Sequence, residues 1–160
     1  MQGKDSSREL LRHAVATLAY RAGKVLRGAP DTFSDYGSGE KGRTPGRILA
    51  HMGDLMDWAL SMAQGKQEWH DSLAQAWPKE VDRFFAAVKG FDDYLASELP
   101  LSYSIDKLFQ GPVADALTHT GQLAMLRRMA GCPIRGENYF RAKITAGRVG
   151  LDQAAPEREF

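Results

Sequence analysis

Two histidines and one aspartate, His51, Asp115 and His119, are the residues of this sequence whose types and positions best suit a chemical reaction. Asp115 and His119 are four residues apart, which places both side chains on one face of a helix, one turn from each other. A buried carboxylate and two imidazoles are stable when they bind a cation or pair with one another. Three protein ligands leave coordination positions open for water or substrate, as in catalytic metal sites. We therefore predict that these residues bind one divalent ion, and their types suit zinc, nickel, iron(II) or manganese.

Simpler interpretations of the same residues stay open. Asp115 and His119 can form an exposed ion pair, which is the commoner reason for this spacing on a helix. His51 can be a hydrogen-bonded core histidine or a surface residue near a helix start. The remaining histidines are weaker candidates, because His13 lies opposite the apolar stripe of its helix and His70 lies in a connector.

Two predicted helices must position these ligands. Thr44 as N-cap and Pro45 at the first helical position begin one of them, and Gly65 marks its end. Pro112 begins the other, which covers residues 112–130 and stops at Gly131. The ligands belong to two stripes at helical spacing: His51, Leu55, Trp58 and Met62, and Asp115, His119, Gln122, Leu126 and Met129. Because the later part of each stripe is apolar, we expect both stripes to face the core, with the ligands converging at one end of it.

Two further helices complete a predicted all-α four-helix bundle. One covers residues 7–26, where Ser6 and Glu9 form a capping box, and the other covers residues 77–97 after a connector longer than a tight turn. A short helical turn is expected at residues 105–109. The sequence contains no alternating β-branched run that would indicate a strand. We expect one domain, residues 1–160, with a helical core at 6–131 and an irregular tail at 132–160 that frays from residue 153 on.

Composition and charge narrow the classes of partner. The 160 residues include 21 Lys and Arg against 20 Asp and Glu, and a formal net charge of +1 gives no electrostatic reason to bind nucleic acid or an anionic membrane. No apolar run approaches the ~20 residues that span a bilayer, and the polar start of the sequence lacks the apolar segment of a signal peptide. Cys132 is the one cysteine, which excludes a disulfide within the chain. We expect a cytoplasmic protein.

Some side chains near the predicted site have two interpretations. Gln122, one turn beyond His119, can orient that ligand or simply pack at a helix contact. Asn138 and Tyr139, in the segment RGENYF, can fold back over the open end of the site, although an aromatic anchor that pins the tail to the bundle is favoured. No separate general base is identifiable. Other polar residues are expected in plain structural roles: Asp54 and Asp57 as surface charges, Arg127 and Arg128 as solvated cations, and Cys132 as a small packed residue.

Two segments, TPGRILAHMGDLMDW and DALTHTGQLAMLRRMAG, resemble the metal-binding motifs of the DinB/YfiT-like four-helix bundles. In this comparison His51 matches the first metal ligand of the family, and His119, two residues before Gly121, matches the last. Asp115 stands where many relatives have the middle histidine, so a hard carboxylate replaces an imidazole there. The resemblance extends over most of the chain, and it implies the bundle fold, a bound metal and a homodimer.

The same resemblance implies a class of reaction. Relatives include thiol-dependent S-transferases and a thiol-dependent isomerase, in which the metal activates a low-molecular-weight thiol, and others described as metal-dependent hydrolases. We therefore expect a metal-dependent transferase or hydrolase with a small-molecule substrate, whose ion lowers the pKa of a bound water or thiol. The alternative is a non-catalytic dimeric helical bundle whose metal site is structural, incidental or vestigial.

Overall fold

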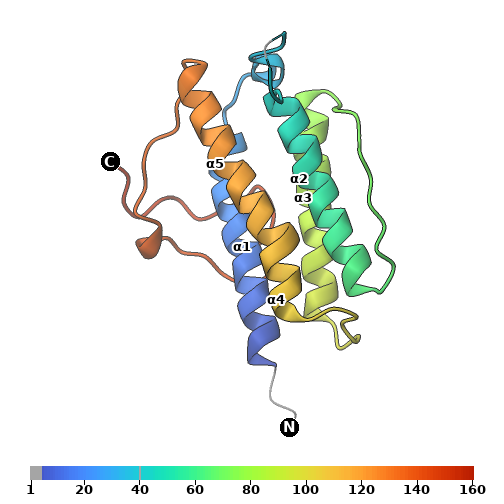
Figure 1. Ribbon diagram of the computed structural model, residues 1–160. Helices are drawn as coiled ribbons and strands as arrows, with labels where there is room; N and C mark the ends of the chain where they lie inside the picture. Colours follow the sequence, from blue (N-terminus) through green and yellow to red (C-terminus); the bar gives the residue numbers. More distant parts are fainter. Residues whose placement is uncertain (1–4, 40) are drawn as a thin grey trace.

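Four long helices pack around one apolar core in the computed structural model, which describes residues 5–39 and 41–160 (Figure 1). The helices are α1 (Ser6–Leu26), α2 (Pro45–Ala63), α3 (Trp77–Ala96) and α5 (Ala114–Met129). The described residues form no strand beyond one isolated bridge between Glu137 and Glu159, so the all-α prediction is confirmed. Residues 1–4, which begin the segment used to exclude a signal peptide, and Glu40 lie outside the described residues.

The helices do not follow a simple up-and-down order. Both α1 and α2 pack on α3 and on α5, so α1 and α2 lie diagonally across the bundle. In Figure 1, α1 and α5 run in one direction while α2 and α3 run in the other. Residues 64–76 form an extended connector that returns along the outside of the bundle and makes α2 and α3 parallel neighbours (Figure 1). Because this connector is longer than a tight turn, it allows an order of helices other than simple up-and-down.

The start of α2 is formed as predicted. The Thr44 side chain accepts a hydrogen bond from the backbone N–H of Arg47, and Pro45 occupies the first turn. The helix ends at Ala63, and Gly65, two residues later, has a φ of 82°, the left-handed conformation that glycine adopts without strain. Gly46 is also required, because a Cβ atom there would lie 2.3 Å from the Oγ atom of Ser34 in the short 3-10 helix η1 (Asp31–Asp35).

The start of α1 differs by one residue from the prediction. Asp5, not Ser6, is the N-cap, and its carboxylate accepts a hydrogen bond of 3.0 Å from the backbone N–H of Ser7. A carboxylate is at least as good an N-cap as a hydroxyl, and its charge also interacts favourably with the positive end of the helix dipole. The predicted capping box of Ser6 and Glu9 is therefore wrong.

Pro112 does not begin the last helix, as the sequence predicted. It lies inside a helical stretch that begins with α4 (Ile105–Leu108), continues through the wide π turn η2 (Phe109–Val113) and leads directly into α5. A proline lacks an N–H, and its ring collides with the carbonyl four residues earlier in a regular α-helix. The π turn accommodates the ring by widening the backbone, and it ends two residues before Asp115.

The core-facing side of α5 also differs from the predicted stripe. The buried residues of α5 are Ala116, Thr120, Leu123 and Arg127. Met129 is 62% exposed, so the predicted stripe lies along the groove between α2 and α5 rather than in the core. Arg127, expected to be solvated, is buried and donates hydrogen bonds of 2.8 Å to the carbonyls of Val25 and Arg27. Its charge is satisfied by backbone oxygens that hydropathy cannot reveal.

The end of the tail is held in place, which contradicts the expected fraying from residue 153 on. The backbone N–H of Phe160 donates to the carbonyl of Gly136, and that of Asn138 donates to Arg158, both at 3.0 Å. The ammonium group of Lys24 on α1 lies 3.0 Å from a carboxylate oxygen of Glu137 and 3.0 Å from one of Glu159. No helix in the described part of the chain is long and apolar enough to cross a membrane.

Candidate metal centre

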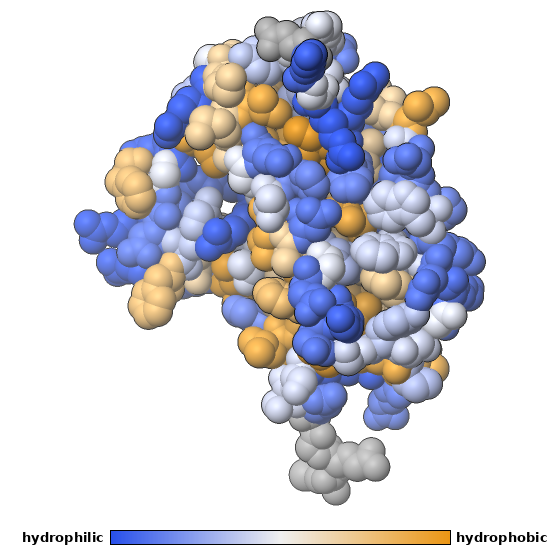
Figure 2. Space-filling model, viewed as in Figure 1, coloured by the Kyte–Doolittle hydropathy of each residue, from blue (hydrophilic) through white to orange (hydrophobic). Residues whose placement is uncertain are grey.

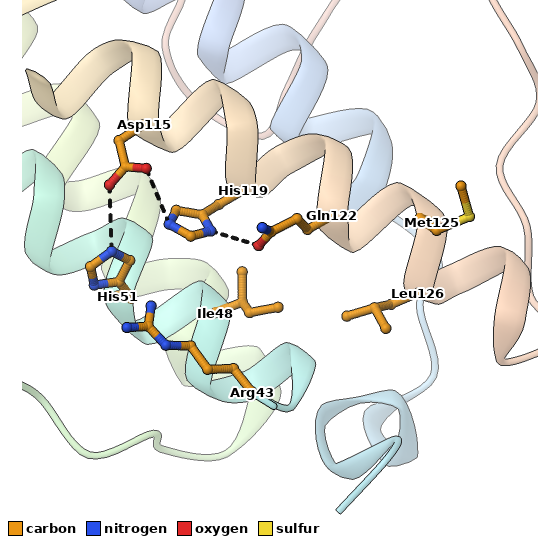
Figure 3. A pocket seen from close by; sticks show the side chains of 8 residues that line it. All are labelled: Arg43, Ile48, His51, Asp115, His119, Gln122, Met125 and Leu126. Carbon is orange, nitrogen blue, oxygen red and sulfur yellow. Dashed lines mark hydrogen bonds and ion pairs between the residues drawn. The ribbon is translucent and has the colours of Figure 1, made fainter. Parts of the chain in front are cut away.

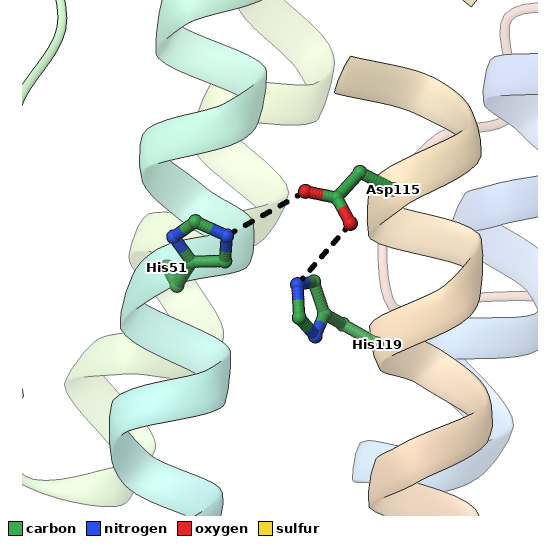
Figure 4. A group of neighbouring side chains, drawn as sticks. All are labelled: His51, Asp115 and His119. Carbon is green, nitrogen blue, oxygen red and sulfur yellow. Dashed lines mark ion pairs between the residues drawn. The ribbon is translucent and has the colours of Figure 1, made fainter. Parts of the chain in front are cut away.

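His51 on α2 faces Asp115 and His119 on α5 across the groove between the two helices (Figure 4). The Nε2 atom of His51 lies 3.6 Å from Oδ2 of Asp115, and Nε2 of His119 lies 3.4 Å from Oδ1 of the same carboxylate. The two imidazole rings are perpendicular, with centroids 4.8 Å apart. The structure thus brings together all three residues that the sequence predicted as ligands.

The separations of these atoms fit a shared cation better than direct hydrogen bonds. Two ligand atoms that each lie ~2.1 Å from a tetrahedral ion are about 3.4 Å apart. The two Asp115 contacts, at 3.4 and 3.6 Å, are close to that separation and longer than the ~2.7–3.2 Å of an ordinary hydrogen bond. One ligand atom from each residue can be chosen so that all three lie within 4.8 Å of one another, and a contraction of at most about 1.4 Å would bring them to that tetrahedral separation.

Gln122 supports His119 from the next turn of α5. Its Oε1 atom lies 2.7 Å from Nδ1 of His119 (Figure 3). In the tautomer with the proton on Nδ1, His119 donates this hydrogen bond to the amide oxygen, and its Nε2 lone pair faces Asp115. Of the two interpretations that the sequence allowed for Gln122, orientation of the ligand is the one this contact favours.

The environment of His51 favours its neutral imidazole. Burial lowers the pKa of His51, and the positive charge of Arg43 and the neighbouring His119 lower it further, against the opposing effect of Asp115. The edge of His51 also packs on the indole of Trp69, with ring centroids 5.6 Å apart. A neutral imidazole offers the lone pair that a metal ion requires.

The three residues lie in the wall of a cavity of about 670 Å³. The cavity extends along the α2–α5 groove toward the start of α2, where Ile48 and Leu126 give it an apolar wall (Figure 3). Seen from the side of Figure 1, apolar surface lies between hydrophilic side chains over the upper ends of α2 and α5 (Figure 2). The ligand set therefore opens to a space that can admit a small molecule. The lining residues are Arg43, Ile48, His51, Asp115, His119, Gln122, Met125 and Leu126.

Trp69 is held against His51 by the anchoring of the extended connector. Asp54 of α2 is 2% exposed and accepts hydrogen bonds from both the backbone N–H and the hydroxyl of Ser72, at 2.9 and 2.7 Å. Arg83 of α3 completes the contact with a nitrogen 3.2 Å from Asp54. Asp54 was expected to be a surface charge, which is wrong: it ties the connector to two helices. Asp57 is a partly exposed partner of the same arginine, at 3.6 Å.

The tail does not reach the metal centre. Tyr139 packs edge-on against Tyr20 of α1, with ring centroids 6.3 Å apart, and the guanidinium of Arg21 lies 4.2 Å from the centre of its ring. The Asn138 side chain accepts a hydrogen bond from the backbone N–H of Phe140 in the same turn. The structure places neither Asn138 nor Tyr139 among the residues that line the metal-centre cavity, and Tyr139 instead packs the tail against α1, as in the favoured alternative. His13, His70 and Arg128 are exposed, and Cys132 is half-buried against the core.

Sequence reasoning missed two residues beside the site, Arg43 and Trp69. Arg43 directly precedes the Thr44 cap, about two helical turns before His51, so its position near the site could have been noticed. Trp69 lies in an irregular connector, where no periodicity indicates which way a side chain points. Comparison of the chain with protein-family models, curated proteins and solved structures finds no match.

Proposed function

We propose that this protein is a metal-dependent enzyme in which His51, Asp115 and His119 hold a catalytic divalent ion. One observation carries the proposal: three donor groups from two helices face one another at the wall of an open cavity. A structural zinc site has four protein ligands and is closed, whereas three ligands leave a position for water or substrate. Two imidazoles and a carboxylate suit zinc, nickel, iron(II) or manganese.

The contact between His119 and Gln122 supports the proposal independently. With its proton on Nδ1, His119 directs a lone pair at Oδ1 of Asp115, and two acceptors face each other at 3.4 Å. That arrangement is repulsive unless a proton or a cation lies between the two atoms. A divalent ion bound by both atoms removes the repulsion, and it also satisfies His51, whose lowered pKa disfavours protonation.

The reaction that we propose is thiol-dependent S-transfer to a small molecule, or hydrolysis of one. It rests on the resemblance of the two sequence segments to the metal-binding motifs of the DinB/YfiT-like four-helix bundles. The bound ion would lower the pKa of a coordinated thiol or water. The chain itself supplies an apolar wall, Ile48 and Leu126, that shields the reacting groups on one side. Gln122 holds His119 in its orientation. A low-molecular-weight thiol is the proposed co-substrate, and the cytoplasm, where thiols stay reduced, is the proposed location.

A second candidate function is that of a non-catalytic dimeric bundle. An apolar groove between the start of α1 and α4 favours it, because Leu10 is 69% and Phe109 is 44% exposed there. Exposed apolar side chains that share one groove are typical of interfaces. A homodimer is compatible with both candidates, so metal binding is the property that separates them.

Elemental analysis of protein purified without an affinity tag tests the proposal. We expect about one zinc, nickel, manganese or iron ion per chain, and we expect its removal by a chelator to lower the melting temperature, since an ion that binds only the folded state stabilises it. His119→Ala should abolish binding, whereas His13→Ala, which removes an exposed histidine of α1, should not. If none of the four ions binds, either as purified or when added, the enzyme proposal fails and the non-catalytic bundle remains.

A further inference from the structure

Two arginines at the start of α2 border the open side of the metal centre. Arg43 directly precedes the N-cap Thr44 and lies outside α2, whereas Arg47 lies in the first turn of α2, and both residues are exposed. Arg43 lines the metal-centre cavity, and both arginines line a second cavity of about 600 Å³. The two cavities share Arg43 and His51, so Arg43 lies where the cavities meet, and Arg47 lines the second cavity alone.

This pair of like charges is not neutralised within the described part of the chain. No ion pair there involves Arg43 or Arg47. Asp54 lines the second cavity, but its oxygens already accept from Ser72 and Arg83. Asp71 is the other carboxylate lining that cavity. An oxyanion bound by both guanidinium groups would supply the negative charge that these arginines lack and would accept charge-assisted hydrogen bonds from them.

Arg43 and the apolar wall line the same cavity as the metal ligands. Figure 3 shows Arg43 extending from the start of α2 toward His51, beside Ile48 and across the groove from Leu126. A molecule bound in this groove would contact the cationic side chain of Arg43, the aliphatic side chains of Ile48 and Leu126, and the three metal ligands. Such a lining suits an amphipathic molecule rather than a uniformly polar one.

We propose that Arg43 and Arg47 form an anion subsite that selects small substrates with a carboxylate or phosphate group and an apolar body lying on Ile48 and Leu126. The guanidinium groups bind the oxyanion, and the apolar body leads to the metal ligands. The proposal rests on the proposed function for the role of the bound molecule as substrate. The binding of the anion itself requires only the arginines and the apolar wall, so it can be measured without metal.

Binding of three matched six-carbon probes to the full-length chain tests the subsite: hexanoate, hexyl phosphate and uncharged hexanol, by calorimetry, first without metal and then with zinc. Without metal, we expect at least one of the two anions to bind about tenfold or more tightly than hexanol. Arg43→Gln and Arg47→Gln should each weaken that anion about tenfold, and Arg43→Lys, which keeps the charge but loses the planar fork, should weaken it less. Arg141→Gln, an exposed arginine of the tail, should leave binding unchanged.

The outcomes separate this proposal from the metal proposal. Equal affinity for hexanol and both anions, or unchanged anion affinity in both glutamine variants, overturns the subsite even if zinc binds stoichiometrically. Arginine-dependent binding of the anion in a chain that binds no metal supports the subsite and removes only the proposed catalysis. The difference between hexanoate and hexyl phosphate identifies which oxyanion the subsite prefers.

Discussion

The Nδ1 atom of His119 lies 2.7 Å from the Oε1 atom of Gln122, three residues later on α5. An imidazole with its proton on Nδ1 donates to this amide oxygen and presents the Nε2 lone pair to Asp115. The contact also restricts rotation of the ring, because the amide is attached to the same rigid helix. The orientation of one ligand is therefore set within α5, before any contact with α2 is made.

Gln122→Leu should weaken metal binding about tenfold without removing it, because loss of a hydrogen-bond partner of a ligating histidine typically costs 10–100-fold in affinity. Competition with a chromophoric chelator measures the change. Thr118→Ala, on an exposed position of the same helix, is the control and should bind metal as the wild type does. An unchanged affinity in Gln122→Leu would mean that the glutamine contact has no part in metal binding.

Asp115 should determine which ion the site prefers. Asp115→Asn removes the negative charge and should weaken binding of all four candidate ions. Asp115→His replaces a hard oxygen ligand with an imidazole and should shift the preference from manganese toward zinc and nickel. Parallel titrations of wild type and both variants with manganese and zinc measure the shift. If the ratio of the two affinities is the same in wild type and Asp115→His, Asp115 is not a ligand.

The sequence predicted the parts of this site that depend on local spacing. The N-cap Thr44 and the first-turn Pro45 set where α2 begins. The four-residue interval from Asp115 to His119 places both side chains one turn apart on any helix, independent of tertiary packing. The face that α5 turns to the core was predicted wrongly, because Thr120 and Arg127 are buried polar residues whose hydrogen bonds go to backbone carbonyls. Thr120 donates to the Ala116 carbonyl within α5, whereas the partner of Arg127, the carbonyl of Val25, is set by tertiary packing, which the periodicity of the sequence does not reveal.

Asp54 should be essential for the position of the connector. Asp54→Ala removes the acceptor of Ser72 and leaves Arg83 with a lost partner, and breaking such a buried pair typically costs about 3 kcal/mol in free energy of unfolding. Asp57→Ala is the matched control, since the Asp57 side chain is 44% exposed, and it should cost under ~1 kcal/mol. Urea unfolding measures both. Tryptophan fluorescence should report the release of Trp69 in the first variant alone.

The positive charge of Arg43 should affect the pKa of His51. Burial and the Arg43 charge lower the pKa of His51, so Arg43→Gln should raise that pKa toward its ordinary value and Asp115→Asn should lower it further. Because the pKa is lower in the folded than in the unfolded chain, the metal-free protein should lose stability as pH falls below ~6.5, where the unfolded chain takes up the proton first. An NMR titration of the imidazole resonances tests the pKa, and His51→Gln should flatten this part of the stability profile.

Glu137 should hold the tail to the bundle more strongly than any exposed ion pair of the tail. Its side chain is 0% exposed, accepts a hydrogen bond from the hydroxyl of Tyr20 and lies 3.0 Å from the ammonium group of Lys24. Glu137→Ala leaves that ammonium group with the partly exposed Glu159 alone, so we expect a loss of about 3 kcal/mol in free energy of unfolding. Glu157→Ala breaks the exposed pair with Lys143 and should cost under ~1 kcal/mol. This cluster joins the tail to α1, away from the α2–α5 groove, so metal affinity should be the same in both variants. A loss of metal binding in Glu137→Ala alone would instead show that the tail affects the metal site.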